Sequence, residues 1–291
     1  MTQLRSALAA GLLALALSTA GAATPRAEIA VKNGEKIAFL GDSITQGGMG
    51  ATGYVTLVIH GLKTNGINAT AIGAGISGHK SNDMLARLQR VVIDKKPQWV
   101  TLSCGVNDVW HGEKGVPLDA YKQNLTQIVD KAQAAGIKVL ILTATMITEN
   151  PKEANNQKLA AYNDFLRELA KEKKCLLADL NAAMQRDLDE LEKAGRKRGT
   201  LLTSDGVHMN PFGNQMMAEG VLRGFGLDDA AAAKAKAAWL DIPGGISVNA
   251  SARLTLRQYQ ALEALAAKEG KSVQALLQAA LDRDVAEILK K

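Results

Sequence analysis

Short apolar runs alternate with longer amphipathic segments along most of the chain. Mostly continuous apolar runs predict five strands that are buried on both faces. They lie at residues 36–40, 68–72, 99–103, 138–143 and 175–177. Strands that alternate with helices are typical of βαβ units and a parallel sheet. We therefore expect an α/β fold in which a five-stranded parallel sheet lies between two layers of helices.

Helical periodicity and capping residues mark the segments between these strands. The clearest helices are predicted at residues 118–135 and 153–171. A further helix should begin at Pro211, because proline suits the first helical turn and Asn210 can cap it. This helix should end by Gly224 or Gly226.

The first 23 residues have the layout of an export signal. A short region with Arg5 precedes an apolar run at residues 7–17, and small residues at 20–22 resemble a cleavage site. The run is shorter than the roughly 20 residues of a membrane span. We expect export to the periplasm or outside the cell, and no later segment reads as a membrane span.

The composition changes after residue 227. A helix rich in alanine and lysine at 230–239 precedes a Pro-Gly-Gly breaker. A short alternating stretch at 252–256 then precedes two helices, which are separated by Gly270 and of which the second is capped by Ser272. The predicted organisation is a signal peptide at 1–23, a main domain at 24–228, a linker with a short helix at 229–246 and a C-terminal strand and helix–helix appendage at 247–291.

Composition and charge exclude few function classes. Hydrophobic residues at 47% and charged residues at 22% are ordinary for a globular protein, so the chain should fold. The net charge of +6 makes the surface mildly cationic, but the basic stretch at 193–198 is too short to indicate a nucleic-acid partner. Cys104 and Cys175 are predicted on non-adjacent strands, which favours buried free thiols over a disulfide.

Residues suited to acyl chemistry follow the predicted strands. Ser43 follows the first strand, Gly78 the second and Asn107 the third, whereas Asp205 and His208 lie in the loop after the fifth strand and its helix. Open parallel sheets bind ligands outside the carboxyl ends of their strands. One crevice is therefore expected to receive all five residues.

Four short motifs resemble those of the GDSL or SGNH hydrolases, serine esterases and lipases on a flavodoxin-like sheet. The motifs are GDSIT at 41–45, GISG at 75–78, GVND at 105–108 and DGVH at 205–208. The resemblance covers about residues 35–227 and implies a flavodoxin-like three-layer sandwich, so that the main domain would be an SGNH-type hydrolase domain. One departure is Gly73, where many relatives carry asparagine.

The resemblance assigns a role to each candidate residue. Ser43 would be the nucleophile, His208 the general base and Asp205 the acid that orients it. The backbone N–H groups of Ser43 and Gly78 and the amide of Asn107 would form the oxyanion hole. No cofactor and no metal ion are implied.

Each residue also has a structural interpretation. Ser43 could cap a helix, and Asn107 could form an ordinary turn. Trp110, His111 and His79 could line the substrate pocket or belong to the core. A GxGxxG match at 48–53 suggests a dinucleotide site, but it does not directly follow the strand and lacks the acidic residue about 20 positions later. The ordered motifs favour catalysis.

The predicted function is hydrolysis of carboxylic esters through an acyl-enzyme. Short acyl groups, above all acetyl, on carbohydrates are the first choice, because the chain resembles exported family members that deacetylate polysaccharides. A lipid or lysophospholipid ester is the alternative substrate. A binding or assembly module that uses the C-terminal hairpin is the alternative of another class. That hairpin resembles a ribbon-helix-helix unit, and we expect it to pack on the main domain or to join two chains as a homodimer.

Overall fold

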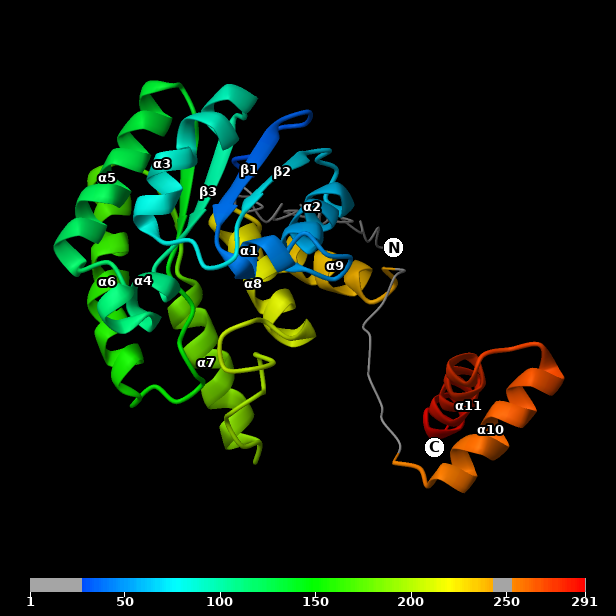
Figure 1. The fold of residues 1–291 in the computed structure, drawn as a ribbon. Coiled ribbons are helices and arrows are strands. Elements are labelled where there is room, and N and C mark those ends of the chain that lie inside the picture. Colours follow the sequence, from blue (N-terminus) through cyan, green and yellow to red (C-terminus); the bar gives the residue numbers. More distant parts are fainter. Residues whose placement is uncertain (1–27, 243–252, 291) are drawn as a thin grey trace, which may run out of the picture. The chain divides into compact units, whose positions relative to one another are not determined.

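A computed structural model describes residues 28–242 and 253–290 (Figure 1). The chain divides into two compact units, Met1–Ile246 and Ser247–Lys291. The predicted signal peptide and the Pro-Gly-Gly breaker lie outside the described residues.

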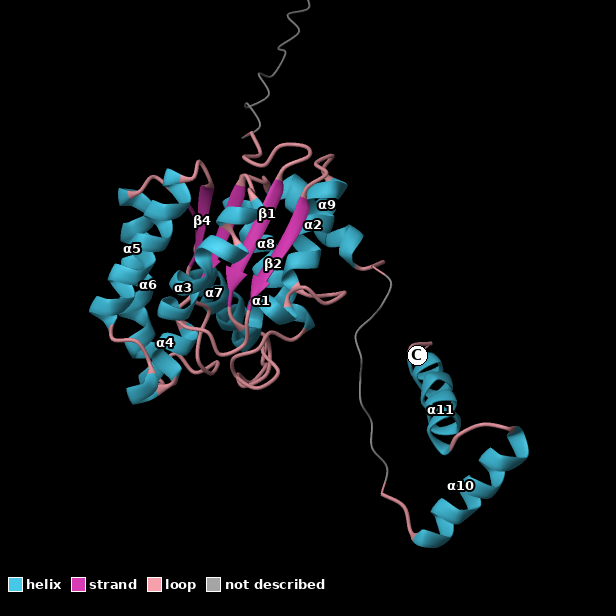
Figure 2. Cartoon of the chain, turned by 45° about the horizontal axis from the view of Figure 1, so that its top comes forward, coloured by secondary structure: helices cyan, strands magenta, loops and turns pink. Residues whose placement is uncertain are grey.

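One parallel sheet forms the centre of the first unit, with the strand order β2-β1-β3-β4-β5 (Figures 1 and 2). The strands are β1 (Lys36–Gly41), β2 (Thr70–Gly75), β3 (Trp99–Ser103), β4 (Lys138–Leu142) and β5 (Leu176–Ala178). The predicted five-stranded parallel fold is confirmed. β2 begins two residues later than predicted, because its register with β1 pairs Lys36 with Thr70 and Gly41 with Gly75.

Helices form two groups that pack against the sheet (Figure 2). One group consists of α3 (Ser81–Val91), α5 (Leu118–Ala134) and α6 (Ala154–Glu172), and the other of α2 (Tyr54–Thr64), α7 (Leu180–Lys193), α8 (Pro211–Gly224) and α9 (Asp229–Trp239). Two short helices, α1 (Ser43–Gly47) and α4 (Val106–Trp110), follow strands β1 and β3. The layers match the predicted three-layer arrangement.

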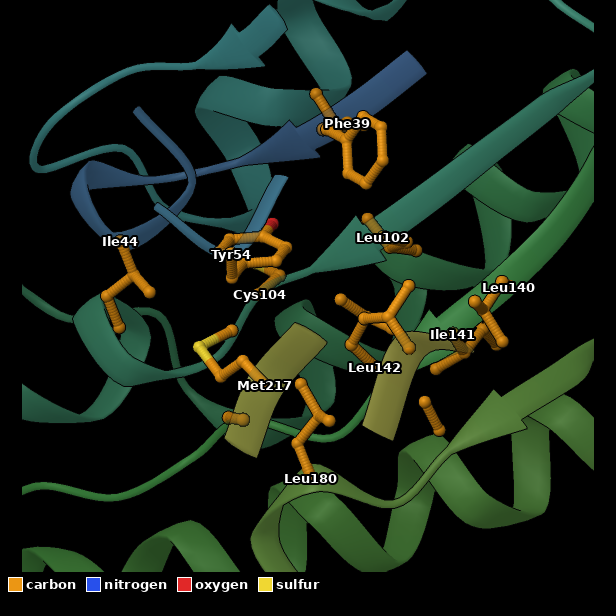
Figure 3. Close-up of a cluster of buried hydrophobic side chains, with 14 of the residues drawn as sticks. Phe39, Ile44, Tyr54, Leu102, Cys104, Leu140, Ile141, Leu142, Leu180 and Met217 are labelled. Atoms are coloured by element: carbon orange, nitrogen blue, oxygen red, sulfur yellow. The ribbon is translucent and has the colours of Figure 1, made fainter. Parts of the chain in front are cut away.

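The core fills the space between the sheet and the helices (Figure 3). Phe39 of β1, Leu102 of β3 and Leu142 of β4 are fully buried and belong to one cluster with Tyr54 of α2 and Met217 of α8. Burial on both faces explains why the strands read as continuous apolar runs. Each such side chain stabilises the fold by about 1.5–3 kcal/mol.

Helix α9 packs against α2 as part of the first unit. The Trp239 side chain is buried, and its Nε1 donates a hydrogen bond of 2.9 Å to the carbonyl of Leu57. The short helix expected within a linker therefore adds to the core of the first unit.

The two cysteines lie just outside strands instead of within them. Cys104 follows β3 and is buried, whereas Cys175 precedes β5 and is half-buried. Both thiols are free, as expected. The expectation that both thiols are buried is wrong for Cys175.

The second unit is a pair of helices, α10 (Leu256–Glu269) and α11 (Val273–Ile288). The strand expected at 252–256 is wrong for the described residues: 253–255 form no strand, and Leu256 begins α10. The reason is a capping box, in which Thr255 accepts a hydrogen bond from the Gln258 backbone and the Gln258 side chain accepts one from Thr255. Gly270 and Ser272 end one helix and cap the next, as predicted.

Candidate active site

A tight turn from β1 into α1 presents Ser43 at the carboxyl edge of the sheet. Gly41 must be glycine here, because an added Cβ would lie 2.0 Å from the Thr45 hydroxyl oxygen. Asp42 caps the helix by accepting a hydrogen bond of 2.9 Å from the Ile44 backbone. The helix cap is therefore Asp42, which leaves the Ser43 hydroxyl available for another partner.

A hydrogen-bonded chain joins Ser43, His208 and Asp205. Nε2 of His208 lies 2.9 Å from Oγ of Ser43, and Nδ1 of His208 lies 2.7 Å from Oδ2 of Asp205. Oδ1 of Asp205 also accepts hydrogen bonds from the backbone of Val207 and His208. The structure thus brings together all three residues that the motifs predict as a triad.

The carboxyl of Asp205 remains ionised at neutral pH. Its desolvation would raise the pKa, but hydrogen bonds from the His208 ring and from the backbone of His208 and Val207 lower the pKa to about 2. An ionised carboxylate only accepts hydrogen bonds, so Nδ1 of His208 carries the proton. Nε2 of His208 is then free to accept the proton of Ser43.

Three hydrogen-bond donors gather at the same edge of the sheet. In the described part of the chain, the backbone N–H groups of Ser43 and Gly78 donate to no protein acceptor. Gly78 has φ = 76°, which glycine adopts without strain. Nδ2 of Asn107 donates to the carbonyl of His79, 3.2 Å away, and lies 3.4 Å from Oδ2 of Asp42. The Asn107 amide therefore bridges the two loops that carry Ser43 and Gly78.

Arg87 on α3 binds the ends of β1 and β2, from which these two loops start. The sequence did not predict this role. Its guanidinium donates to the carbonyls of Gly41 and Ala74, at 2.8 and 2.7 Å, and to Nδ1 of His79 at 3.2 Å. The only sequence signal is an arginine at a helix position that faces the core beside Leu88. Such a residue fixes the ends of β1 and β2 without touching the triad.

Two buried carboxyl groups, those of Asp42 and Asp108, lie in or near the serine turn. Asp42 is 3% exposed, and its burial raises the pKa to about 6, although the hydrogen bond from Ile44 and the charge of His208 oppose the shift. Asp108 accepts hydrogen bonds from the Ser81 backbone and from Sγ of Cys104. Burial and the neighbouring Asp108 raise the pKa of Cys104 well above its ordinary value, so this thiol is unsuited to nucleophilic attack.

The three rings proposed to line the substrate pocket differ in exposure. Trp110 is 45% exposed and lies on α4, one turn after Asn107. His111 is exposed beside it, with ring centroids 6.1 Å apart. His79 is half-buried, and burial together with the Arg87 charge lowers its pKa. Within the described residues, none of the three rings hydrogen-bonds to Ser43 or His208.

Among residues 28–242 and 253–290, no group of three or more His, Cys, Asp or Glu side chains is placed to hold a metal ion. None of the described helices has the length and hydropathy that a membrane crossing requires.

Known proteins are similar to this chain in sequence and in fold. The model of the GDSL-like Lipase/Acylhydrolase family matches residues 39–216. An acetylxylan esterase of Geobacillus stearothermophilus is 30% identical over 218 residues, which cover 68% of this chain and 97% of that protein. Esterase TesA of Pseudomonas aeruginosa is 29% identical and covers 70% of this chain and 90% of its own. The crystal structure of the acetyl xylan esterase AlAXEase superposes with a TM-score of 0.61 and 35% identity, covering 65% of this chain and 98% of its own.

Proposed function

The chain belongs to the GDSL-like lipase/acylhydrolase family and is a carboxylic ester hydrolase, and we propose that it removes acetyl groups from carbohydrates with Ser43 as nucleophile. The observation that carries this proposal is the hydrogen-bonded chain from Oγ of Ser43 through the His208 ring to Asp205. A serine hydroxyl attacks an ester only when a base removes its proton. In this arrangement His208 is the base and Asp205 is the carboxylate that orients it.

In the first half of the proposed reaction, Oγ of Ser43 attacks the ester carbonyl while Nε2 of His208 takes the hydroxyl proton. Asp205 stabilises the resulting imidazolium. The negative oxygen of the tetrahedral intermediate accepts hydrogen bonds from the backbone of Ser43 and Gly78 and from Nδ2 of Asn107, which gives up its long 3.4 Å contact with Oδ2 of Asp42. The intermediate collapses when His208 protonates the leaving alcohol, and the acyl group stays on Ser43.

The second half of the reaction frees the enzyme. Nε2 of His208 removes a proton from water, and the hydroxide attacks the acyl carbon on Ser43. The same three donors stabilise the second oxyanion, and His208 returns the proton to Oγ of Ser43 as the carboxylic acid leaves. Ester and water are converted to alcohol and acid, and no cofactor takes part.

A carbohydrate acetyl ester is the substrate class that the observations favour. Two relatives are named as acetylxylan esterases, and each matches this chain over almost all of its own length. Trp110 presents an exposed indole one helical turn from Asn107, where a sugar ring attached to the acetyl group could stack. The alternative, a lipid ester, would need an apolar surface around the serine to bind the acyl chain.

A comparison of substrates tests this choice. We expect turnover of acetylated xylo-oligosaccharides and p-nitrophenyl acetate, and little of p-nitrophenyl palmitate or lysophospholipid. Trp110→Ala should raise KM for the oligosaccharide about tenfold, which corresponds to about 1.4 kcal/mol, and leave p-nitrophenyl acetate unchanged. Tyr259→Ala removes an exposed ring from the second unit and serves as control. Preference for the long-chain esters would overturn the proposal in favour of a lipid esterase.

We also propose that the protein is exported and loses residues 1–23. The basic, apolar and small-residue regions of this segment support the proposal. Mass spectrometry of protein from the periplasm or medium should place the mature N-terminus at or next to Thr24. Recovery of the intact chain from the cytoplasm alone would contradict it.

A further inference from the structure

Glu149 is a buried carboxylate that belongs to none of the four motifs that mark the site. It follows β4 and is 1% exposed. Burial of a charged group is costly unless hydrogen bonds replace its hydration. The chain therefore either keeps this group neutral or surrounds it with donors.

Donors from one short segment surround Glu149. Oε2 accepts from the backbone of Gly199 and Leu201 at 2.8 and 2.9 Å. Oε1 accepts from the backbone of Leu202 and Thr203 at 2.7 and 2.9 Å, and from the Thr203 hydroxyl at 2.9 Å. Burial would raise the pKa of this carboxyl, but these hydrogen bonds outweigh it and lower the pKa. Glu149 is thus an anion that binds residues 199–203 through both oxygens.

The anchored segment forms the base of the loop that carries Asp205 and His208. Thr203 and Met209 form an antiparallel bridge, and Ser204 donates a backbone hydrogen bond of 2.8 Å to the carbonyl of His208. These two contacts close the loop at its base, next to the residues that Glu149 binds.

The residue before Glu149 holds the tip of the same loop. The backbone N–H of Thr148 donates a hydrogen bond of 2.8 Å to the carbonyl of Gly206. Thr148 has φ = 62°, a left-handed conformation that a β-branched residue rarely adopts. This backbone is strained, which indicates that the surrounding contacts impose its geometry.

The two functional side chains of the loop are largely exposed. The side chains of Asp205 and His208 are 51% and 40% exposed, so packing restrains them weakly. Their position relative to Ser43 depends on the backbone of the loop. We propose that Glu149 is a positioning residue, which aligns His208 with Ser43 by anchoring residues 199–203. This inference rests on the proposed function of the triad.

Substitution of Glu149 by glutamine tests the role with almost no change of shape. An amide offers one acceptor oxygen, and its NH2 group would face backbone N–H donors. We expect kcat for p-nitrophenyl acetate to fall about 10²-fold, the effect of a displacement of about 1 Å in a reacting group, with little change in KM. The low-field proton NMR resonance of Nδ1–H in His208 should broaden or disappear.

Asp179→Asn is the matched control. Asp179 is another carboxylate with several donors, which include Arg167, Thr143 and the Ala182 backbone, but its side chain is 31% exposed and, among the described residues, has no hydrogen bond to the 199–208 segment. We expect this variant to lose thermal stability while keeping kcat and the low-field resonance. If Asp179→Asn loses as much kcat as Glu149→Gln for the same drop in Tm, Glu149 is merely structural and the proposal is wrong.

A milder variant keeps the test valid if Glu149→Gln does not fold. Thr203→Val removes only the hydroxyl donor to Glu149, and a smaller fall in kcat with a shifted His208 resonance is expected. Wild-type activity and resonance in both Glu149→Gln and Thr203→Val would overturn the proposal. An inactive wild-type protein that still shows the resonance, and loses it in Glu149→Gln, would instead contradict the proposed function alone.

Discussion

Ser43 owes its surroundings to the two residues that precede it. Gly41 permits the sharp turn, and Asp42 occupies the cap position, so the hydroxyl of Ser43 is left for His208. The same turn buries the carboxyl of Asp42 beside the amide of Asn107. The serine turn therefore contains a carboxyl, that of Asp42, whose negative charge destabilises the fold.

The pH dependence of stability should reveal this carboxyl. The pKa of Asp42 is raised to about 6 in the folded protein, from 3.8, so the folded state holds a proton that the unfolded state releases between these values. The unfolding free energy should therefore fall by about 2 kcal/mol between pH 4 and pH 6, out of a total of about 3 kcal/mol over a wider pH range, from 1.36 kcal/mol per pKa unit. Asp42→Asn, which can still cap the helix, should lose this slope in urea denaturation. Parallel profiles for the two proteins would contradict the assignment.

Single residues also show where sequence reasoning stops. The proposed triad and oxyanion donors lie in short motifs with a defined order, so the sequence indicates them as a set. Glu149 and Arg87 act through residues far along the chain: Glu149 binds Leu201 and Leu202, which are 52 and 53 positions away. No local pattern marks such contacts, because they exist only after the chain has folded.

Elements were predictable where burial was complete. β1 and β3 are buried and read as continuous apolar runs, whereas β2 is a half-exposed edge strand that contains Gly73 and Gly75, and its start was misplaced. In the second unit, the alternating residues suggested a strand, but the cap at Thr255 starts a helix instead. Local capping thus outweighed a two-residue periodicity too short to build a sheet alone.

The residue that caps α8 also binds the segment that Glu149 anchors. Asn210 caps this helix by accepting from the backbone of Phe212 and Gly213, and its amide donates to the carbonyl of Leu201. Asn210→Ala should lower the unfolding free energy by about 1–2 kcal/mol, measured by urea denaturation. A change below about 0.5 kcal/mol would show that the cap adds little, as for ordinary surface substitutions.

The whole molecule combines a unit with a large core and a unit with almost none. In the second unit Ala266 is the one side chain among residues 253–290 that is fully buried, and apolar residues such as Leu277 and Ile288 are exposed. A pair of helices that buries so little apolar surface is expected to be marginal alone. The homodimer expected through this segment therefore stays a prediction, and its physical reason is that a second copy would cover these exposed apolar side chains.

Light scattering of two proteins tests the homodimer. The full mature chain should have twice the mass of one chain, whereas a protein that ends at residue 242 should be a monomer with unchanged kcat for p-nitrophenyl acetate. The truncated protein retains the core and the triad. A monomeric full-length chain would exclude self-association through the second unit at the concentration measured.

The central claim is that Ser43, activated by His208, carries the acyl group. An activated serine attacks the phosphorus of a p-nitrophenyl phosphonate and releases p-nitrophenol, and the phosphonyl group stays on the serine, so intact-mass and peptide mass spectrometry report the nucleophile directly. We expect one phosphonyl group per chain, located on Ser43, with loss of esterase activity in proportion to labelling and no labelling of Ser43→Ala. A label on another residue, or full esterase activity in Ser43→Ala, would contradict it.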